Sequence, residues 1–330
     1  MAGSPANLEE IAKAARLSKT TVSLILNDKG DQYRINPKTQ ERVVALARSR
    51  GYAPNQNARS LRMDKTQTLG LVVPDLTNYF FAELSKAFEA AARRGGFEIF
   101  ITCSDDSAEI ERNAIRNLYS RKVDGLVVAS VASESALADY EAHVPTVFID
   151  RQPSGRQHSW ITSDNHAGAR LLIDHLIGAG KRDIWYIGGL KGLSTSKDRL
   201  AGYKAALAKH RIPFDAQRVS HGAFTWESGY QQAKALFARK PASPTCIFTA
   251  SFTLFEGVMR YIQETRRWIP ADLQLATFDD HPLLDFLSTR VPSVQQDCAA
   301  IAEAAFNALV SAKAAERRMR IAPRLITREP

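Results

Sequence analysis

The sequence predicts a small all-α headpiece that contains a helix-turn-helix, followed by a larger α/β domain of two doubly wound lobes. Three observations support this fold class. Two short amphipathic segments lie between Asn7 and Asn27, positive charge is concentrated before Lys65, and short apolar strands alternate with longer helical stretches from Thr68 onward. A chain of 330 residues is long enough for two or three domains, and 45% hydrophobic with 24% charged residues is typical of a globular protein.

The stretch NLEEIAKAARLSKTTVSLILN, from Asn7 to Asn27, predicts two short helices joined by a tight turn. In the first helix the spacing of one buried face is kept by Leu8, Ile11, Ala12 and Ala15. Ser18 can cap the second helix, where the same spacing is kept by Val22, Ile25 and Leu26. Two helices with so short a turn cross steeply, which is the helix-turn-helix geometry. An ordinary helical hairpin is the alternative.

The start of the second helix carries small polar or cationic side chains that can reach base edges from a major groove. These candidates are Ser18, Lys19, Thr20, Thr21 and Ser23. Residues 1–65 hold 12 Lys and Arg against 6 Asp and Glu, so much of the formal net charge of +9 lies in this first fifth of the chain. Such an imbalance is typical of a segment that binds nucleic-acid phosphates. Double-stranded DNA is therefore the predicted partner of the headpiece.

A third headpiece helix is predicted to begin at Asn36-Pro37, because Asn is favoured as an N-cap and Pro at the first helical position. Its apolar residues Val43, Val44 and Ala47 can close the core over the first two helices, and Gly51 favours its end.

The basic stretch APNQNARSLRMDKTQ follows, and Asn55 can cap one further short helix there, ending near Met63. A helix of this length is marginal by itself in water. Leu61 is a large apolar residue without a helical partner face, so it can act as a wedge between base pairs in the minor groove, with the helix ordering on DNA. The alternative is that Leu61 packs on the α/β domain.

From Thr68 the pattern indicates parallel sheets covered by helices on both faces. The predicted strands are LGLVVP, FEIFIT, GLVVAS, TVFID, IWYIGG, TCIFTA and LQLATF, and the predicted helices include FFAELSKAFEAAARRGG, AEIERNAIRNLYSRK, AGARLLIDHLIGAGK and LFEGVMRYIQETRR. This is too much chain for one small sheet, so two similar lobes are expected, with the break at 163–166 and a return near Val294. Ligands in such folds bind outside the carboxyl ends of the strands, here in the cleft between the lobes.

Several function classes are disfavoured. No apolar run is long enough to span a membrane, and the polar start MAGSPANLEE is not typical of a signal peptide, so we expect a cytoplasmic protein without a membrane partner. Cys103, Cys246 and Cys298 lack metal-ligand spacing, which predicts buried thiols and neither a metal nor a cofactor. The motifs GxxxxGK[ST], GxSxG and HExxH are absent, and the seven histidines form no ligand cluster, so an enzyme is not expected.

The chain resembles the lac repressor/galactose repressor family of bacterial transcription regulators in NLEEIAKAARLSKTTVSLILN, NPKTQERVVALARSRGYAPNQNARSLR and LGLVVPDL. A narrower resemblance to the fructose repressor (catabolite repressor/activator) and sucrose repressor branch rests on NDKGDQYRI, CSDDSAEIERNAIRNLYSRKVDGLVVAS, TASFTLFEGVM and LATFDDHPLLDFL. Members of that branch respond to phosphorylated sugars such as fructose 1-phosphate. The resemblance therefore implies a DNA-binding regulator, without a cofactor, that forms a homodimer or a tetramer and is released or modulated by a sugar phosphate.

The resemblance also implies three parts: a headpiece at 1–54, a hinge helix and linker at 55–66, and a periplasmic-binding-protein-like effector-binding and dimerisation domain at 67–330. Its first lobe would hold 67–165 and 295–320, and its second lobe 166–294 and 321–330. Four linker residues are implied to contact DNA, with Leu61 as the minor-groove wedge: Asn55, Ala58, Leu61 and Arg62.

Candidate effector-binding residues follow the predicted strands. Arg151 comes directly after TVFID, and Arg199 lies in the loop LKGLSTSKDR after IWYIGG. A guanidinium matches a phosphate bidentately, although an arginine after a strand is commonly a surface or ion-pair residue. Ser194 and Ser196 can provide hydroxyl donors for the same anion. Asp279 and Asp280 can accept hydrogen bonds from sugar hydroxyls, and Phe80 and Phe81 can stack on the apolar face of the sugar. The resemblance adds Ser251 and Gln296.

The chain departs from the family at several positions. Ser251-Phe252 stands where most members have Asn-Asp, which argues against a free-sugar effector. The wider family places its sugar-binding carboxylate at Asp279 and the fructose branch at Asp280, so both stay candidates. His281 replaces the branch's usual Asn. The alternatives are a regulator that responds to a free sugar or another small metabolite, and a solute-binding protein of the periplasmic type.

Overall fold

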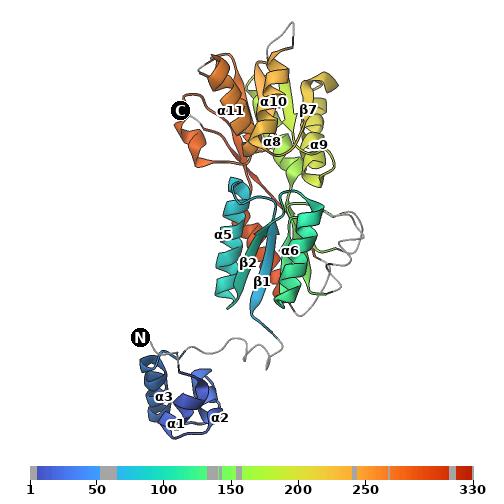
Figure 1. Cartoon of the computed structure of the whole chain (residues 1–330). Helices are drawn as coiled ribbons and strands as arrows, with labels where there is room; N and C mark the ends of the chain where they lie inside the picture. Colours follow the sequence, from blue (N-terminus) through green and yellow to red (C-terminus); the bar gives the residue numbers. More distant parts are fainter. Residues whose placement is uncertain are drawn as a thin grey trace. The chain divides into compact units, whose positions relative to one another are not determined.

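The computed structural model describes residues 6–52, 65–131, 140, 143–153, 158–239, 244–266, 268–311 and 317–328. Contacts within the chain divide it into two compact units, Met1–Thr66 and Gln67–Pro330 (Figure 1). No helix among these described residues is both long and apolar enough to cross a membrane. The predicted hinge residues Asn55, Ala58, Leu61 and Arg62 lie outside the described residues.

The headpiece is a three-helix unit formed by α1 (Leu8–Ala15), α2 (Lys19–Leu26) and α3 (Pro37–Ser49). Asn7 and Glu10 cap α1 reciprocally, while Ser18 caps α2 and Asn36 caps α3. Between α1 and α2 the chain turns within Arg16–Ser18, where Arg16 adopts a left-handed backbone with φ 55°. The three helices enclose one apolar core that contains Ile11, Val22, Ile25 and Val43. The predicted helix-turn-helix is confirmed.

The first lobe of the larger unit is a six-stranded sheet in the order β11-β5-β4-β3-β1-β2, with every pair parallel. Its strands are β1 (Thr68–Val73), β2 (Glu98–Cys103), β3 (Gly125–Val128), β4 (Thr146–Ile149), β5 (Trp160–Ser163) and β11 (Arg318–Ile321). Its helices are α5 (Tyr79–Arg94), α6 (Ala108–Ser120) and α12 (Cys298–Val310). Because strand residues alternate between faces, Leu71 packs under α5 and α12 while its neighbour Val72 packs under α6.

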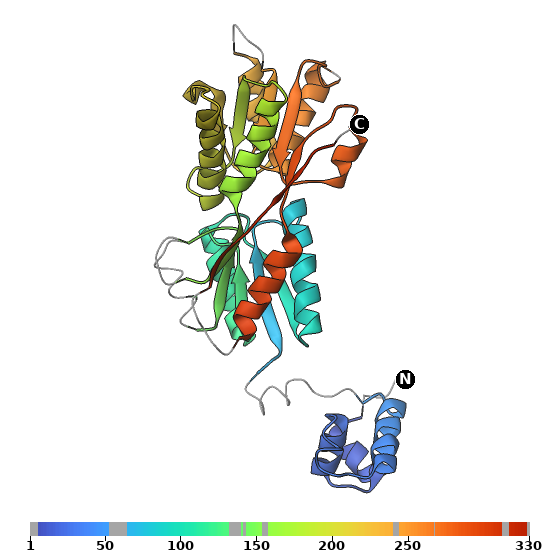
Figure 2. The ribbon, with the colours of Figure 1, turned by 180° about the vertical axis from the view of Figure 1, so that it is seen from behind.

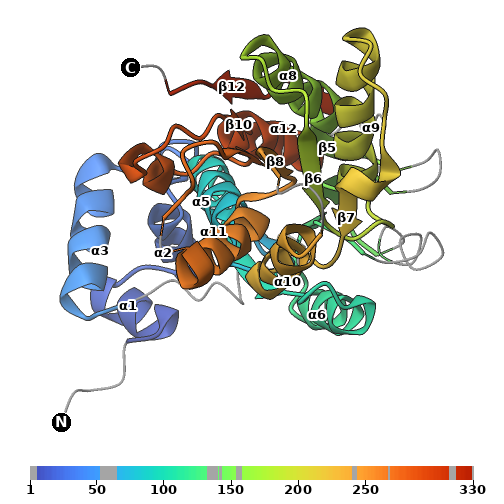
Figure 3. The same cartoon turned by 90° about the horizontal axis from the view of Figure 1, so that it is seen from above.

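The second lobe has a sheet in the order β12-β10-β9-β8-β6-β7, in which only β12 runs antiparallel to its neighbour. Its strands are β6 (Ile184–Gly188), β7 (Val219–His221), β8 (Cys246–Thr249), β9 (Gln274–Phe278), β10 (Ser293–Gln295) and β12 (Arg324–Ile326). Its helices are α8 (Asn165–Gly178), α9 (Ser194–Lys209), α10 (Trp226–Phe237) and α11 (Phe252–Arg266), with short 3-10 turns η1 (Ala216–Arg218) and η2 (Pro282–Phe286). Figure 3 shows α8 beside α9 and α10 beside α11.

Both lobes place their first five strands in the order second, first, third, fourth, fifth, which is a doubly wound arrangement. The predicted two-lobed α/β fold is confirmed. The chain passes between the lobes after β5, after β10 and again between β11 and β12, the last seen in Figure 2 as a continuous dark red run. The lobe bounds differ slightly from the prediction. Gln295, predicted in the first lobe, pairs in the sheet of the second lobe, and Ile321, predicted in the second lobe, pairs in the sheet of the first.

Candidate functional site

The polar start of α2 forms one candidate surface. Ser18, Lys19 and Thr20 are exposed, whereas Thr21 and Ser23 are half-buried beside the core residues Val22 and Ile25. The hydroxyl of Ser18 accepts the backbone N–H of Thr21 at 3.0 Å, so this side chain holds the helix start in place. Lys19 and Thr20 are the exposed candidates whose side chains are not used to cap the helix.

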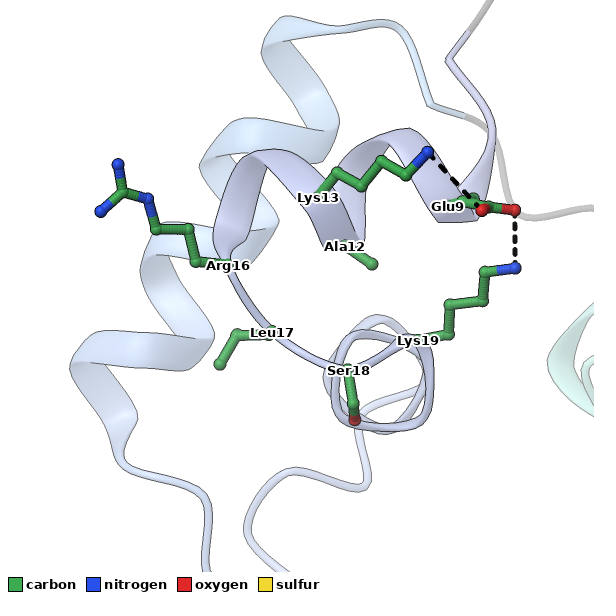
Figure 4. Close-up of a pocket in the computed structure, with 7 residues that line it drawn as sticks. All are labelled: Glu9, Ala12, Lys13, Arg16, Leu17, Ser18 and Lys19. Atoms are coloured by element: carbon green, nitrogen blue, oxygen red, sulfur yellow. Dashed lines mark hydrogen bonds and ion pairs between the residues drawn. The ribbon is translucent and has the colours of Figure 1, made fainter.

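A shallow hollow lies beside this surface, between α1 and the start of α2 (Figure 4). It is lined by Glu9, Ala12, Lys13, Arg16, Leu17, Ser18 and Lys19. The ammonium group of Lys19 lies 2.6 Å from one carboxylate oxygen of Glu9, and that of Lys13 lies 3.7 Å from the other. Three cations and one carboxylate therefore border the hollow, which suits contact with a polyanion.

The second candidate site lies where the strands of the two lobes end. Arg151 follows β4 and is 5% exposed. Its Nη2 donates to the Asp106 carboxylate at 2.6 Å, its Nη1 donates to the carbonyl of Ala129 at 3.4 Å, and its Nε lies 3.7 Å from the carboxylate of Asp150. A buried guanidinium with carboxylate partners is a built feature of the site rather than a surface residue.

Arg199 is 3% exposed and enters the site from the second lobe. Its Nε donates to Asn165 Oδ1 at 2.7 Å, its Nη1 donates to the carbonyl of Ala250, and its guanidinium carbon lies 3.8 Å from the centre of the Phe278 ring. The predicted loop around Arg199 is instead the beginning of α9, which starts at Ser194 without a side-chain cap. Without a capping side chain at Leu193, no local signal marks the start of this helix.

Two neighbouring carboxylates at the end of β9 have different surroundings. Asp279 is buried, has a φ of 70°, and accepts a hydrogen bond from Gln296 Nε2 at 2.6 Å. Asp280 accepts instead from Ser293 at 2.6 Å and from Arg328 at 2.7 Å, within a network on the other side of the strand end. The structure therefore brings Asp279 and Gln296 to Arg199, whereas the side chain of Asp280 is committed to Arg328.

Burial raises the pKa of Asp279, against the lowering effect of Arg199 and of the hydrogen bonds from Gln296 and from the backbone N–H of Phe252. A carboxylate removed from water stays ionised only where cations and hydrogen-bond donors compensate for the lost water, and Arg199, Gln296 and the backbone N–H of Phe252 have this role here.

The hydroxyl residues take different roles. Ser194 Oγ accepts the backbone N–H of Gln152 at 2.7 Å and so joins the second lobe to the first. Ser251 Oγ accepts the backbone N–H of Leu254 at 3.3 Å, at the start of α11. Ser196 is 1% exposed, and its hydroxyl has no hydrogen-bond partner among the described residues.

Phe80 and Phe81 are 7% and 5% exposed and belong to the apolar core of the first lobe. Little of either ring is left to stack on a ligand. Their neighbour Tyr79 instead crosses to the second lobe, where its ring centre lies 4.2 Å from that of His281, and His281 stacks on Phe252 at 4.2 Å. The prediction overlooked Tyr79, and the helical spacing of α5 is the signal that could have separated it from the two core rings.

Three buried polar atoms of this site lack hydrogen-bond partners among the described residues: Arg151 Nε, Ser196 Oγ and Gln296 Oε1. Buried polar atoms are nearly always hydrogen-bonded, so a polar ligand is the simplest way to satisfy them. Arg151 Nε and Ser196 Oγ can donate and Gln296 Oε1 can accept, and these atoms belong to the same site as the guanidinium groups of Arg151 and Arg199. This arrangement can hold a small molecule that has both an anionic group and hydroxyls.

Asp150 is a further buried group that the sequence prediction did not single out, although it is the first polar residue after β4. The pKa of Asp150 is raised to about 6, mainly by burial and also by the charges of Asp279 and Asp106, against the lowering effect of Arg151 and Arg199. A raised pKa in the folded state means that the native protein holds this proton more tightly than the unfolded chain.

Stability is therefore expected to fall as pH rises from about 4 to about 6, by roughly 3 kcal/mol at most from this group. Thermal unfolding of Asp150→Asn and the parent across this range tests the prediction. The unfolding temperature of the variant should gain on that of the parent as pH rises, whereas the exposed control Asp272→Asn should track the parent. A difference between Asp150→Asn and the parent that does not change with pH contradicts the prediction.

No group of His, Cys, Asp and Glu side chains is arranged to hold a metal ion in the parts of the chain that the structure describes.

Residues 7–55 match the family model described as bacterial regulatory proteins, lacI family. Residues 66–303 match the model described as periplasmic binding proteins and sugar binding domain of LacI family. The chain is 39% identical over 293 residues to the sucrose operon repressor of Klebsiella pneumoniae, covering 88% of this chain and 87% of that protein.

Solved structures match as well. The Cra transcriptional dual regulator from Pseudomonas putida, in complex with fructose 1-phosphate, matches 80% of this chain and 99% of its own with a TM-score of 0.72 and 29% identity. The lac repressor dimer bound to operator and the anti-inducer ONPF matches 98% of each chain with a TM-score of 0.85 and 22% identity. The second likeness covers the headpiece as well as the larger unit.

Proposed function

The chain belongs to the lacI family of bacterial regulatory proteins, and we propose that it represses sugar-metabolism genes in the cytoplasm under the control of a phosphorylated sugar such as fructose 1-phosphate. At the coarser level it is a DNA-binding sugar-operon repressor and a transcriptional regulator rather than an enzyme.

The pair of buried guanidinium groups, Arg151 and Arg199, is the observation that supports a phosphorylated effector. Burying two cations is costly unless anions compensate them, and each already has a carboxylate or carbonyl partner, so the site is held together without ligand. The first turn of α9 adds backbone N–H groups and Ser196 beside Arg199. Asp279 and Gln296 then offer acceptors for sugar hydroxyls. The bound fructose 1-phosphate of the Pseudomonas putida regulator agrees with this choice.

A regulator that responds to a free sugar is the second candidate, favoured by Asp279, since a carboxylate binds neighbouring hydroxyls well. A thermal-shift series of the full chain separates the two candidates. Fructose 1-phosphate should raise the unfolding temperature, and fructose at the same concentration should leave it nearly unchanged. A larger shift with fructose contradicts the phosphorylated effector.

In DNA binding, residues 1–54 act as the headpiece, 55–66 as the hinge and 67–330 as the effector-binding and dimerisation domain. Cations beside the α2 surface supply affinity through phosphate contacts, whereas Lys19 and Thr20 supply sequence choice. A homodimer places two such helices on a pseudo-palindromic site. Its interface would cover apolar side chains such as Phe286, which is 83% exposed on η2, and Phe100 on the edge strand β2.

Leu61→Ala is expected to lower the affinity for operator DNA about tenfold or more, because the minor-groove wedge is lost while the phosphate contacts remain. Affinity for unrelated DNA should change little. Gel-shift titrations against both DNAs measure this, with the fructose 1-phosphate thermal shift as a control for the folded effector domain. Equal operator affinity of Leu61→Ala and the parent would mean that Leu61 is not a wedge.

A further inference from the structure

The ion pair between Glu9 and Lys19 joins the first helix of the headpiece to the first residue of the recognition helix. Lys19 Nζ and Glu9 Oε2 lie 2.6 Å apart, and Figure 4 shows the two side chains reaching toward each other from α1 and α2. The hydrogen bond and charge of Lys19 lower the pKa of Glu9, so the carboxylate is ionised at neutral pH. The ion pair therefore favours one direction of the Lys19 side chain over its many other rotamers.

Neither stability nor affinity for DNA explains a carboxylate at this place. Exposed ion pairs contribute little to stability, and both side chains are at least half exposed. A negative charge that borders a surface intended for phosphates weakens DNA binding. The N-terminus of α1 favours acids in its first turn, which contains both Glu9 and Glu10, and Glu10 forms the capping box with Asn7, but this preference does not require a contact between Glu9 and Lys19. The remaining effect of Glu9 is on the direction of the ammonium group of Lys19.

We propose that Glu9 is a positioning residue that fixes Lys19 and so narrows the set of base pairs that the recognition helix accepts. A lysine free to move can donate to guanine or to a phosphate at several positions, whereas a tethered one reaches a single position on the duplex. Glu9 thereby lowers the affinity of the headpiece for DNA somewhat and increases its discrimination between base pairs. This inference rests on the proposed role of α2 as the recognition helix.

The test uses the full chain and an operator selected by it from random duplexes, together with all single-base-pair substitutions of that operator. Lys19→Ala first identifies the base pair whose discrimination depends on Lys19. Glu9→Ala is then expected to lower discrimination at that same base pair about fivefold, which is within what an exposed ion pair can contribute and less than a good bidentate base contact provides. Discrimination at other positions should stay within about twofold, and affinity for unrelated DNA should stay the same or rise.

Glu41→Ala is the matched control, because it removes the same charge from an exposed position of α3. Glu9→Gln, with the carboxylate charge removed and the side-chain length kept, guards against a folding defect, and thermal unfolding of each variant confirms the folded headpiece. In the Lys19→Ala background, Glu9→Ala should have no further effect on discrimination.

Three results would overturn the inference: discrimination by Glu9→Ala within about twofold of the parent, an equal effect of Glu9→Ala in the Lys19→Ala background, or a loss from Lys19→Ala that is uniform over all sequences. Failure of the parent chain to select any sequence is a different result, since it contradicts the proposed function itself.

Discussion

Removal of residues 1–65 is expected to abolish binding to operator DNA and to leave binding of fructose 1-phosphate unchanged. The headpiece has its own apolar core around Ile11, Val22 and Val43, and the larger unit has separate cores in each lobe. Because the contacts divide the chain at Thr66, the larger unit loses none of its core when the headpiece is removed. The cationic surface beside α2 and the hinge are removed together, so specific and non-specific DNA binding should both be lost.

Gel shift and thermal shift on the truncated chain measure the two activities separately. A truncated chain that aggregates or no longer binds fructose 1-phosphate contradicts the independence of the larger unit. Retained operator binding would place the DNA contacts elsewhere in the chain.

Arg199→Ala is expected to weaken fructose 1-phosphate binding at least 100-fold, because the variant loses a buried bidentate donor for the phosphate. Removing this cation also leaves Asp279 and Asp150 poorly compensated, so the variant should be less stable, by about 3–5 kcal/mol if the carboxylates stay charged. Isothermal titration of the folded variant below its unfolding temperature measures the affinity.

Arg199→Lys separates ligand binding from folding, since it keeps the charge near the carboxylates and removes the fork of donors. It should fold better than Arg199→Ala and still bind fructose 1-phosphate at least tenfold more weakly than the parent. Arg260→Ala is the matched control, because Arg260 also stacks on an aromatic ring, that of Trp226, at 3.9 Å in the same lobe. Unchanged affinity in Arg199→Lys would show that the phosphate binds elsewhere.

The sequence was sufficient for the fold because its signals are local. Helical spacing at Ile11 and Val22 predicts the headpiece, and long apolar strands such as LGLVVP predict the sheets. Short strands carry a weaker signal, and β5, β7, β10, β11 and β12, which have three or four residues each, were not predicted. Of these, β7, β11 and β12 are exposed or half-buried over most of their length and contain His or Arg. Their pairing depends on neighbours that the rest of the fold has already placed.

The candidate site was predictable in its location and less so in its contacts. Parallel strands bring their carboxyl ends to one edge, so Arg151 and Asp279 could be placed there from the strand pattern. The difference between Asp279 and Asp280 could not be predicted, because Arg328, far along the chain, occupies the carboxylate of Asp280. Likewise, the hydrogen bond from Arg199 to Asn165 could not be predicted, because the two residues lie far apart in the sequence and on different helices.

One measurement tests most directly the claim that a sugar phosphate in the larger unit controls DNA binding by the headpiece. Fluorescence anisotropy of labelled operator DNA is titrated with the full chain, with and without saturating fructose 1-phosphate. The account predicts that fructose 1-phosphate weakens operator affinity by about 5- to 150-fold, the usual range of coupling between two sites. Operator affinity that stays the same while thermal shift shows fructose 1-phosphate bound to the same preparation would contradict it.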